Sequence, residues 1–325
     1  MLDNSVAQFW KMQLTFLELC TPPQVLQRTE TQGSRVATDL IMTTWIGIDI
    51  GGQSVKAAGI ESAQRSWTGQ SQSYSRPDTD QLTSALRQAI SGHSCNSSSR
   101  IGLCIPGLMD ESGRQVKWSV NVPGLNGLLL DQLIYNALGC TPEHLSIHND
   151  AVAAATDLVH SWRLAGRVIC MAMGTGVGMG VLDDGVPLLV EGASPGHIGQ
   201  VDVSLDEHPP IGPDGGSGSL EAYIGAAALS QRYGSPQQFI ATATIDAPPL
   251  RALTRAIRIC HAIYRPNHII LAGGIGIALK PMIPQLKALI DRDLTNIARE
   301  NWTFATGDHN FHAALGAARL AVAAR

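Results

Sequence analysis

The sequence predicts an α/β protein made of two similar halves, and three observations support this. Apolar runs typical of strands alternate along the chain with segments of helical periodicity. Each half begins with a strand, a glycine-rich turn and a returning strand, first over residues 45–58 and again over 167–184. The chain has 325 residues, 44% apolar and 15% charged, which is enough for two domains with separate cores.

Residues 1–44 precede the first half and differ from it. A short amphipathic helix could run from residue 6 to 19, Pro22 and Pro23 would end it, and the remainder is polar and mixed. The segment has no evident core of its own. Met42 stands just before the first strand, so we expect the functional chain to begin there, with residues 1–44 a loose extension or a misassigned start.

Strands and helices alternate through the first half, separated by polar, glycine and proline residues. We expect, in order, a strand from 45, a glycine turn, a strand to about 60, a polar connection, a helix near 79–91, a strand over 100–105, a loop through 121–125, a helix near 129–137, a strand near 145–148 and a helix after Asn149 and Asp150.

The second half follows the same pattern. Residues 167–173 form a buried strand, 174–180 a glycine-rich turn, and 181–184 the next strand. A later strand at 268–271 also ends in glycines, and an alanine-rich helix at 311–324 closes the chain.

The first glycine turn has the features of a phosphate site. Gly51 and Gly52 allow a tight turn whose backbone N–H groups point one way, which suits an anion. Asp49 could hold Mg²⁺ through water, and the amide of Gln53 can donate to a phosphate oxygen. We expect Lys56, on the returning strand, to bind the cofactor as well. An ordinary hairpin is the alternative that this motif alone leaves open.

Two further glycine turns strengthen the nucleotide interpretation. The turn at Gly174, Thr175 and Gly176 can face the first turn across a cleft, so that the two hold the phosphates of one nucleotide, with the Thr175 hydroxyl as a donor. The turn at Gly273 and Gly274 would bring backbone close to a flat ligand such as adenosine. Each could be structural alone, but together they favour ATP binding.

Composition excludes several other classes of function. The net charge of -4 and the lack of clustered Lys and Arg argue against a nucleic-acid partner. Because no apolar run reaches the roughly 20 residues of a membrane helix, we expect no membrane partner. The six cysteines form no CxxC pair, which suits reduced thiols in a cytoplasmic protein.

Seven segments in order resemble the ROK family of sugar kinases and related regulators, within the actin/hexokinase-like superfamily. The resemblance covers about residues 45–325, and its carriers are residues 47–52, 121–125, 149–151, 174–178, 196–199, 220–223 and 271–274.

The resemblance implies a two-domain actin-like ATPase fold, related to ribonuclease H, with nucleotide and sugar in the cleft between the domains. Residues 45–150 would form the N-terminal α/β domain, with the C-terminal helix at about 311–325 packed back on it. Residues 151–310 would form the C-terminal α/β domain.

The activity that the resemblance implies is ATP- and Mg²⁺-dependent phosphoryl transfer to a sugar hydroxyl, with Asp150 matching the catalytic base. A carboxylate at the start of a helix can orient a hydroxyl and accept its proton. Asn149 and Asp150 are also good helix caps, so capping is the structural alternative.

The sugar-binding residues are also implied by the resemblance. Asn121 and Asn149 match positions that bond sugar hydroxyls, Gly124 lies in the same sugar loop, and Glu221 matches a further sugar-contacting carboxylate. Alternatively, Asn121 bonds its own backbone, and Glu221 is a solvated helix residue.

The chain departs from the family at its zinc motif. Members carry Gly-Glu-x-Gly-His and, later, Cys-x-Cys-Gly-x-x-Gly-Cys-x-Glu, whose histidine and three cysteines bind zinc. Here Gln200 replaces the histidine, and Gly212, Asp214 and Ser219 fall at the cysteine positions. Because zinc prefers Cys and His ligands, we predict no structural zinc.

His197 replaces the sugar-contacting glutamate of the same motif. A neutral imidazole offers one donor and one acceptor where a carboxylate only accepts, so a changed sugar, a weakened kinase and a non-catalytic sugar sensor all stay open. Retention of Asp150 favours the first two. We therefore expect a sugar kinase that acts on the 6-hydroxyl of a hexose or N-acylated amino sugar and forms a homodimer; the rival is a sugar-sensing transcription regulator.

Overall fold

The computed structural model describes residues 45–62, 65–190, 196–212 and 215–323. The expectations about residues 1–44, including the start at Met42, lie outside these ranges, as does Asp214.

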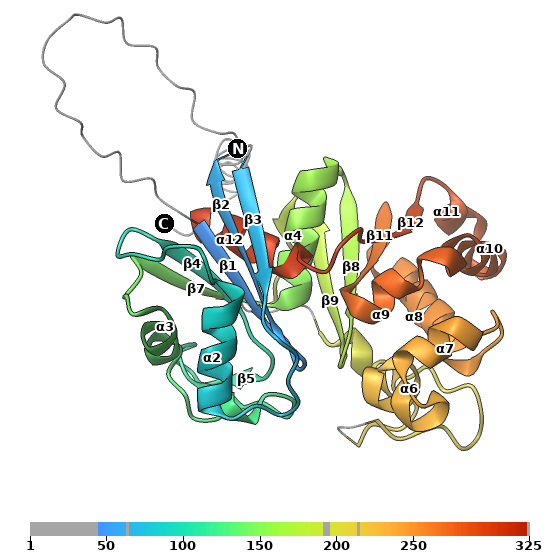
Figure 1. Ribbon diagram of the computed structural model, residues 1–325. Coiled ribbons are helices and arrows are strands. Elements are labelled where there is room, and N and C mark those ends of the chain that lie inside the picture. The colour runs from blue at the N-terminus through green and yellow to red at the C-terminus, as the bar shows by residue number, and fades with distance from the viewer. Residues whose placement is uncertain (1–44, 63–64, 191–195, 213–214, 324–325) are drawn as a thin grey trace, which may run out of the picture.

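Two five-stranded sheets form the frame of the molecule and have the same strand order (Figure 1). The central strand of each sheet, β1 or β8, pairs antiparallel with the strand that follows it in the chain, β2 or β9. On its other side it pairs parallel with β4 or β11, so the predicted duplication is confirmed. The first sheet, β3-β2-β1-β4-β7, contains β1 (Trp45–Ile50), β2 (Val55–Ser62), β3 (Arg65–Gln70), β4 (Arg100–Cys104) and β7 (His144–His148). The second, β10-β9-β8-β11-β12, contains β8 (Arg167–Met173), β9 (Val177–Asp183), β10 (Val186–Pro187), β11 (His268–Ala272) and β12 (Thr303–Thr306).

Three local expectations were wrong, two in the first half of the chain and one in the second. The expected polar connection after residue 60 contains strand β3. This strand lies at the edge of the sheet and pairs only with β2, so its side chains need not be apolar. The loop before residue 125 contains the short hairpin of β5 (Leu108–Met109) and β6 (Val116–Trp118) and the 3-10 turn η1 (Pro123–Leu125).

The second glycine turn is shorter than expected, because β9 already begins at Val177. The strand continues through Gly180, where a Cβ would lie 2.5 Å from the carbonyl oxygen of Ala151. Glycine there allows close contact with a helix and does not mark a turn.

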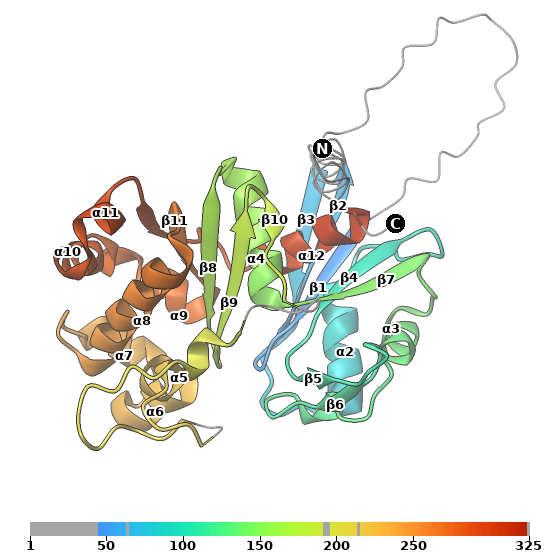
Figure 2. The same cartoon turned by 180° about the vertical axis from the view of Figure 1, so that it is seen from behind.

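Two helices cross between the sheets and join them (Figures 1 and 2). Helix α4 (Asp150–Trp162) follows the first sheet in the chain but packs on β8 and β9. Helix α12 (His312–Ala323) follows the second sheet but packs on β1, β2 and β4, and on α4. A Cβ on Gly316 would overlap the carbonyl oxygen of Ala153, so the two helices can approach only because this residue is glycine.

The first core lies between the first sheet and helices α2 (Thr79–Ala89) and α3 (Leu130–Leu138). The N-cap of α2, Asp78, forms a reciprocal capping box with Gln81, which fixes where the helix begins. The predicted helices near 79–91 and 129–137 are confirmed within two residues at each end.

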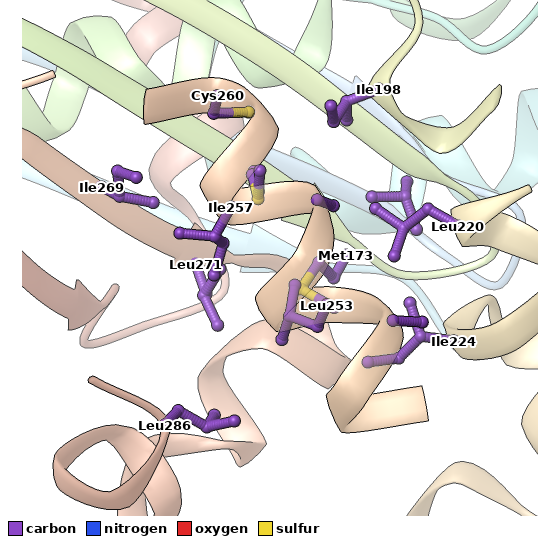
Figure 3. Packing of buried hydrophobic residues seen from close by; sticks show 14 of the residues in the cluster. Met173, Ile198, Leu220, Ile224, Leu253, Ile257, Cys260, Ile269, Leu271 and Leu286 are labelled. Atoms are coloured by element: carbon purple, nitrogen blue, oxygen red, sulfur yellow. The ribbon is translucent and has the colours of Figure 1, made fainter. Parts of the chain in front are cut away.

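The second core surrounds helix α8 (Pro248–Tyr264), whose Leu253, Ile257 and Cys260 face β11 and α5 (Figure 3). Most of its members are fully excluded from water, which supplies the main stabilisation of this half. The other elements are η2 (Ile198–Gln200), α5 (Leu220–Ile224), α6 (Ala226–Tyr233), α7 (Pro236–Thr242), α9 (Gly273–Ala278), η3 (Lys280–Met282), α10 (Ile283–Asp293) and α11 (Asn296–Arg299). None of the described helices is long and apolar enough to cross a bilayer.

Five cysteines fall in the described ranges. Cys104, Cys170 and Cys260 are buried free thiols, and burial raises the pKa of each, so they are poor nucleophiles. Cys95 and Cys140, far apart in sequence, bring their sulfur atoms within 2.8 Å of each other, a pairing that their spacing did not predict.

Candidate active site

The first glycine turn joins β1 to β2 and is closed by a bond from the Gly51 N–H to the Ser54 carbonyl, 3.0 Å. Asp49, near the end of β1, lies opposite Lys56 on β2, and Lys56 Nζ is 3.4 Å from Asp49 Oδ2. The lysine thus partly neutralises the carboxylate. Lys56 also lines the pocket itself, and its direct contact with a nucleotide stays a prediction.

Tyr74 braces this turn from outside and was missed from the sequence. Its hydroxyl donates to the Gly51 carbonyl at 2.6 Å, and its N–H donates to the Gln53 carbonyl at 2.8 Å. Burial and the nearby Asp49 carboxylate raise the pKa of Tyr74, so its hydroxyl stays a donor at neutral pH. No sequence motif marks this tyrosine, because it supports the turn through two backbone carbonyls and lies far from the turn in the sequence.

The second glycine turn is held by a bond from the Gly174 N–H to the Gly176 carbonyl, 2.9 Å. Glu221, at the start of α5, accepts the N–H of Val177 through Oε2 at 3.1 Å. A Cβ on Gly176 would lie 2.8 Å from that same oxygen. Glu221 is therefore packed against the turn, which differs from the solvated helix residue considered above; its contact with sugar stays a prediction.

The two turns face each other. A Cβ on Gly52 would lie 2.8 Å from Thr175 Oγ1 and 3.4 Å from Cβ of Asn121. Residues from the first turn, the second turn and the sugar loop thus meet at one point, although they are widely separated in the sequence.

Asp150 is the first residue of α4, and Asn149 is its N-cap. Asn149 Oδ1 accepts the N–H groups of Ala151 and Val152 at 3.0 and 3.1 Å. The capping interpretation is therefore correct for Asn149, and a sugar contact would fall to its amide nitrogen.

Asp150 is exposed as a residue, but its carboxyl group lies against β9, where a Cβ on Gly178 would be 3.4 Å from Oδ1, and this contact partly excludes water. This desolvation, followed by the Asp49 carboxylate, raises the pKa of Asp150 to about 6. The Ala151 N–H and the charge of His197 act in the opposite direction. A carboxyl group with a pKa near the working pH is suited to accept and release protons.

A pocket lies between the sheets, where the carboxyl ends of β1, β8 and β11 converge. This edge is where α/β sheets bind ligands. The pocket is lined by Asp49, Lys56, Asp150, Ala154, Ala172, Ala272, Gly273, His309, Asn310, His312 and Ala313.

The expected third glycine turn is instead the direct start of helix α9. Gly273 has φ of +76°, and a Cβ there would overlap the Met173 carbonyl oxygen, so this position requires glycine. At Gly274 a Cβ would meet no protein atom within 4 Å, which leaves this backbone accessible to a ligand.

In the sugar loop, Asn121 is exposed beside the first turn, whereas Gly124 is buried. The Gly124 N–H donates to the Pro77 carbonyl at 2.9 Å, and its carbonyl accepts the Thr79 hydroxyl at 2.9 Å. Gly124 thus fixes the loop to the start of α2, because its backbone groups are used within the protein.

His197 is exposed and precedes η2, close enough for its charge to affect Asp150. The described part of the loop that follows is held by local bonds. Ser219 caps α5, with its Oγ accepting the Ala222 N–H at 3.2 Å, and the Gly212 N–H bonds the Gly216 carbonyl at 2.8 Å. The absence of structural zinc stays a prediction.

The residues present fit a magnesium ion at the phosphate end of the pocket. Asp49 and Asp150 both line it, and the charge of Asp49 raises the pKa of Asp150. Carboxylate oxygens are the ligands that Mg²⁺ prefers, directly or through water.

Paired sheets of the same order, two crossing helices and facing glycine turns define the actin-like ATPase fold. The chain belongs to the ROK family, whose family model matches residues 45–324.

Solved structures share this fold at low sequence identity. A ROK family glucokinase from Streptomyces griseus, in complex with glucose and AMPPNP, matches with a TM-score of 0.65 at 19% identity, over 86% of this chain and 100% of that one. A ROK hexokinase from Thermus thermophilus matches with 0.58 at 19%, over 85% and 97%. A ROK family transcriptional regulator, homologous to the E. coli MLC protein, matches with 0.64 at 16%, over 87% and 79%. No curated protein sequence matches the chain.

Proposed function

We propose that this protein is an ATP-dependent sugar kinase that phosphorylates the 6-hydroxyl of a hexose or an N-acylated amino sugar. The observation that carries this proposal is that Asp150, whose raised pKa suits a general base, lines one pocket with Asp49, the carboxylate before the first glycine turn, and with Gly273. The likeness to a glucokinase solved with glucose and AMPPNP supports the same class of reaction.

In the proposed reaction, the sugar oxygen attacks the γ-phosphorus of ATP. Its proton passes to the Asp150 carboxylate, and the bond from phosphorus to the ADP oxygen breaks. N–H groups of the two glycine turns, together with the Thr175 hydroxyl, hold the phosphates in line with the attacking oxygen. Magnesium, when bound near Asp49, would neutralise phosphate charge.

We propose that side chains around Asp150 bind and orient the sugar. Asn121 stands beside the first turn, Asn149 keeps an amide nitrogen directed away from its cap, and Glu221 lies under the second turn. His197 would replace a carboxylate acceptor by an imidazole, so we propose that it selects a different pattern of sugar hydroxyl or acyl groups. We also propose a cytoplasmic homodimer, as the family resemblance implies.

A sugar-responsive regulator is the second candidate, because a regulator of transcription shares the fold with a TM-score of 0.64. Fold likeness alone does not separate the two. The retained Asp150 and its raised pKa favour the kinase, since a sensor has no need of a base.

Coupled ATP turnover across a panel of hexoses and N-acylated amino sugars tests the proposal, with Asp150→Asn as the control. A kinase gives sugar-dependent ADP release that the variant loses. Sugar binding by calorimetry without turnover in either protein would overturn the kinase and support the sensor.

A further inference from the structure

Helix α4 and the start of α12 bring together a second group of polar side chains, of which His309 and His312 line the pocket. Within the described residues, one set of three His, Cys, Asp or Glu side chains places its possible ligand atoms within 4.8 Å of one another: Asp157, His309 and His312. Asp157 comes from α4, His312 is the first residue of α12, and His309 lies in the segment just before that helix, so distant parts of the sequence build this cluster.

The cluster is enclosed and held in position. The side chains of Asp157 and His312 are 0% and 3% exposed, and His309 is 40% exposed. His312 Nδ1 is 2.8 Å from Asp157 Oδ2, and the two imidazole rings stack with centroids 3.9 Å apart. One side is therefore open enough for a small ion to enter beside His309.

Each buried member already has an outer partner of the kind that metal ligands use. Arg319 Nε donates to the second oxygen of Asp157 at 2.9 Å, leaving Oδ2 directed at the histidines. The second ring nitrogen of His312, Nε2, lies 2.9 Å from Asp308 Oδ1, although their alignment falls short of a hydrogen bond. Ligating histidines and carboxylates are commonly oriented by such outer contacts.

Coordination would require a local rearrangement. An ion would replace the proton shared by His312 Nδ1 and Asp157 Oδ2, and this 2.8 Å gap would widen by about half an ångström to the spacing of adjacent tetrahedral ligands. The stacked rings would also turn, because an ion bonds in the plane of each imidazole. His309 Nδ1 makes one long contact, 3.2 Å from the N–H of Phe311, that an ion could replace. Two imidazoles and one carboxylate suit a borderline transition metal such as Zn²⁺ or Co²⁺, whereas Mg²⁺ prefers oxygen ligands alone.

We propose that Asp157, His309 and His312 form a transition-metal site between α4 and α12. His309 and His312 line the same pocket as Asp49 and Asp150, but this site takes no ligand from the proposed phosphate, base or sugar residues, and it does not depend on the proposed kinase activity. Because α4 packs on the second sheet and α12 on the first, an ion there would tie together the two helices that connect the halves.

The test uses the full chain and the metals alone. Zn²⁺ affinity is measured by competition with a chromophoric chelator, and Co²⁺ coordination by its visible absorption. His309→Ala is the test variant, because the half-exposed His309 can be replaced with the fold retained, as circular dichroism checks. His312 is buried, and its loss would confuse folding with binding. His208→Ala, an exposed histidine elsewhere, is the matched control.

We expect one Zn²⁺ or Co²⁺ per chain in the natural protein and in His208→Ala, with at least about tenfold weaker binding in His309→Ala. Zn²⁺ should raise Tm in the first two proteins only, and Mg²⁺ should not compete. No binding by the natural protein, or equal binding by His309→Ala, would overturn the site. Either result leaves the proposed phosphoryl transfer untouched, because no turnover is measured.

Discussion

The carboxylate of Asp49 raises the pKa of Asp150 across the pocket between the sheets, which both residues line. Asp49 stands near the end of the first strand of the first sheet, and Asp150 begins the helix that crosses to the second. The fold therefore places two carboxyl groups in one pocket, where the charge of one disfavours the charged form of the other. Such an arrangement is typical of sites that bind cations and move protons.

Asp150→Asn should lower turnover at least about 100-fold while leaving ATP affinity nearly unchanged, because the amide keeps the shape but accepts no proton. Since the fold disfavours the charged carboxyl, Tm of the variant should be equal to or above that of the natural protein. A coupled assay, nucleotide calorimetry and a melting curve measure the three quantities. Asp206→Asn, an exposed aspartate, serves as control. Retained turnover would refute the role of base.

Activity should fall on the acid side of pH about 6, the value to which desolvation and Asp49 raise the pKa of Asp150. The sign follows from the charged form: the carboxylate is the base, and it is lost as the pH drops through its pKa. The pH profile of kcat/KM, taken between about pH 5 and 8, measures this limb. A profile flat down to pH 5 would contradict a base with this pKa.

His197→Gln should move the same acid limb to higher pH, because the charge of protonated His197 lowers the pKa of Asp150. It should also change the ranking of sugars by kcat/KM, since a glutamine presents a different donor and acceptor pair. The measurement is the pH profile with the best sugar, repeated across the panel. If neither the limb nor the ranking moves, His197 has no part in the site.

The sequence was sufficient for the duplicated frame, because each half repeats a strand, a glycine turn and a strand that apolar patterning marks clearly. Sequence also pointed to Asp150, which the motif around Asn149 identifies. Tyr74 and the cluster at Asp157 could not be found in this way. Both depend on contacts between residues far apart in the chain, and neither shows a periodic or spaced pattern.

The edge strand β3 was also not predicted from the sequence. Strand β3 pairs on one side only, so its residues need not be apolar, and the pattern used to find strands gave no signal there. A glycine inside a strand gave the opposite error, because it predicted a turn where the strand continues. Gly180 indicated a turn, but it is glycine because a helix backbone lies against it.

Gly316→Ala should destabilise the protein by about 1–3 kcal/mol, because its Cβ would overlap the Ala153 carbonyl oxygen where α12 crosses α4. Urea unfolding measures the change. Gly274→Ala is the control, since a Cβ there meets nothing within 4 Å, and it should unfold like the natural protein. Equal unfolding of both variants would mean that the helix crossing tolerates a wider separation.

Tyr74→Phe should raise the KM for ATP about fivefold with little change in kcat, because the variant keeps the ring but loses one hydrogen bond to the Gly51 carbonyl, worth about 1 kcal/mol. The turn would then present its N–H groups to phosphate less rigidly, whereas Asp150 would be unaffected. Tyr135→Phe, at an exposed position on α3, is the matched control and should behave as the natural protein. Initial rates across ATP concentrations measure both parameters. A fall in kcat at unchanged KM would instead assign Tyr74 to the chemical step, acting on charge at Asp49.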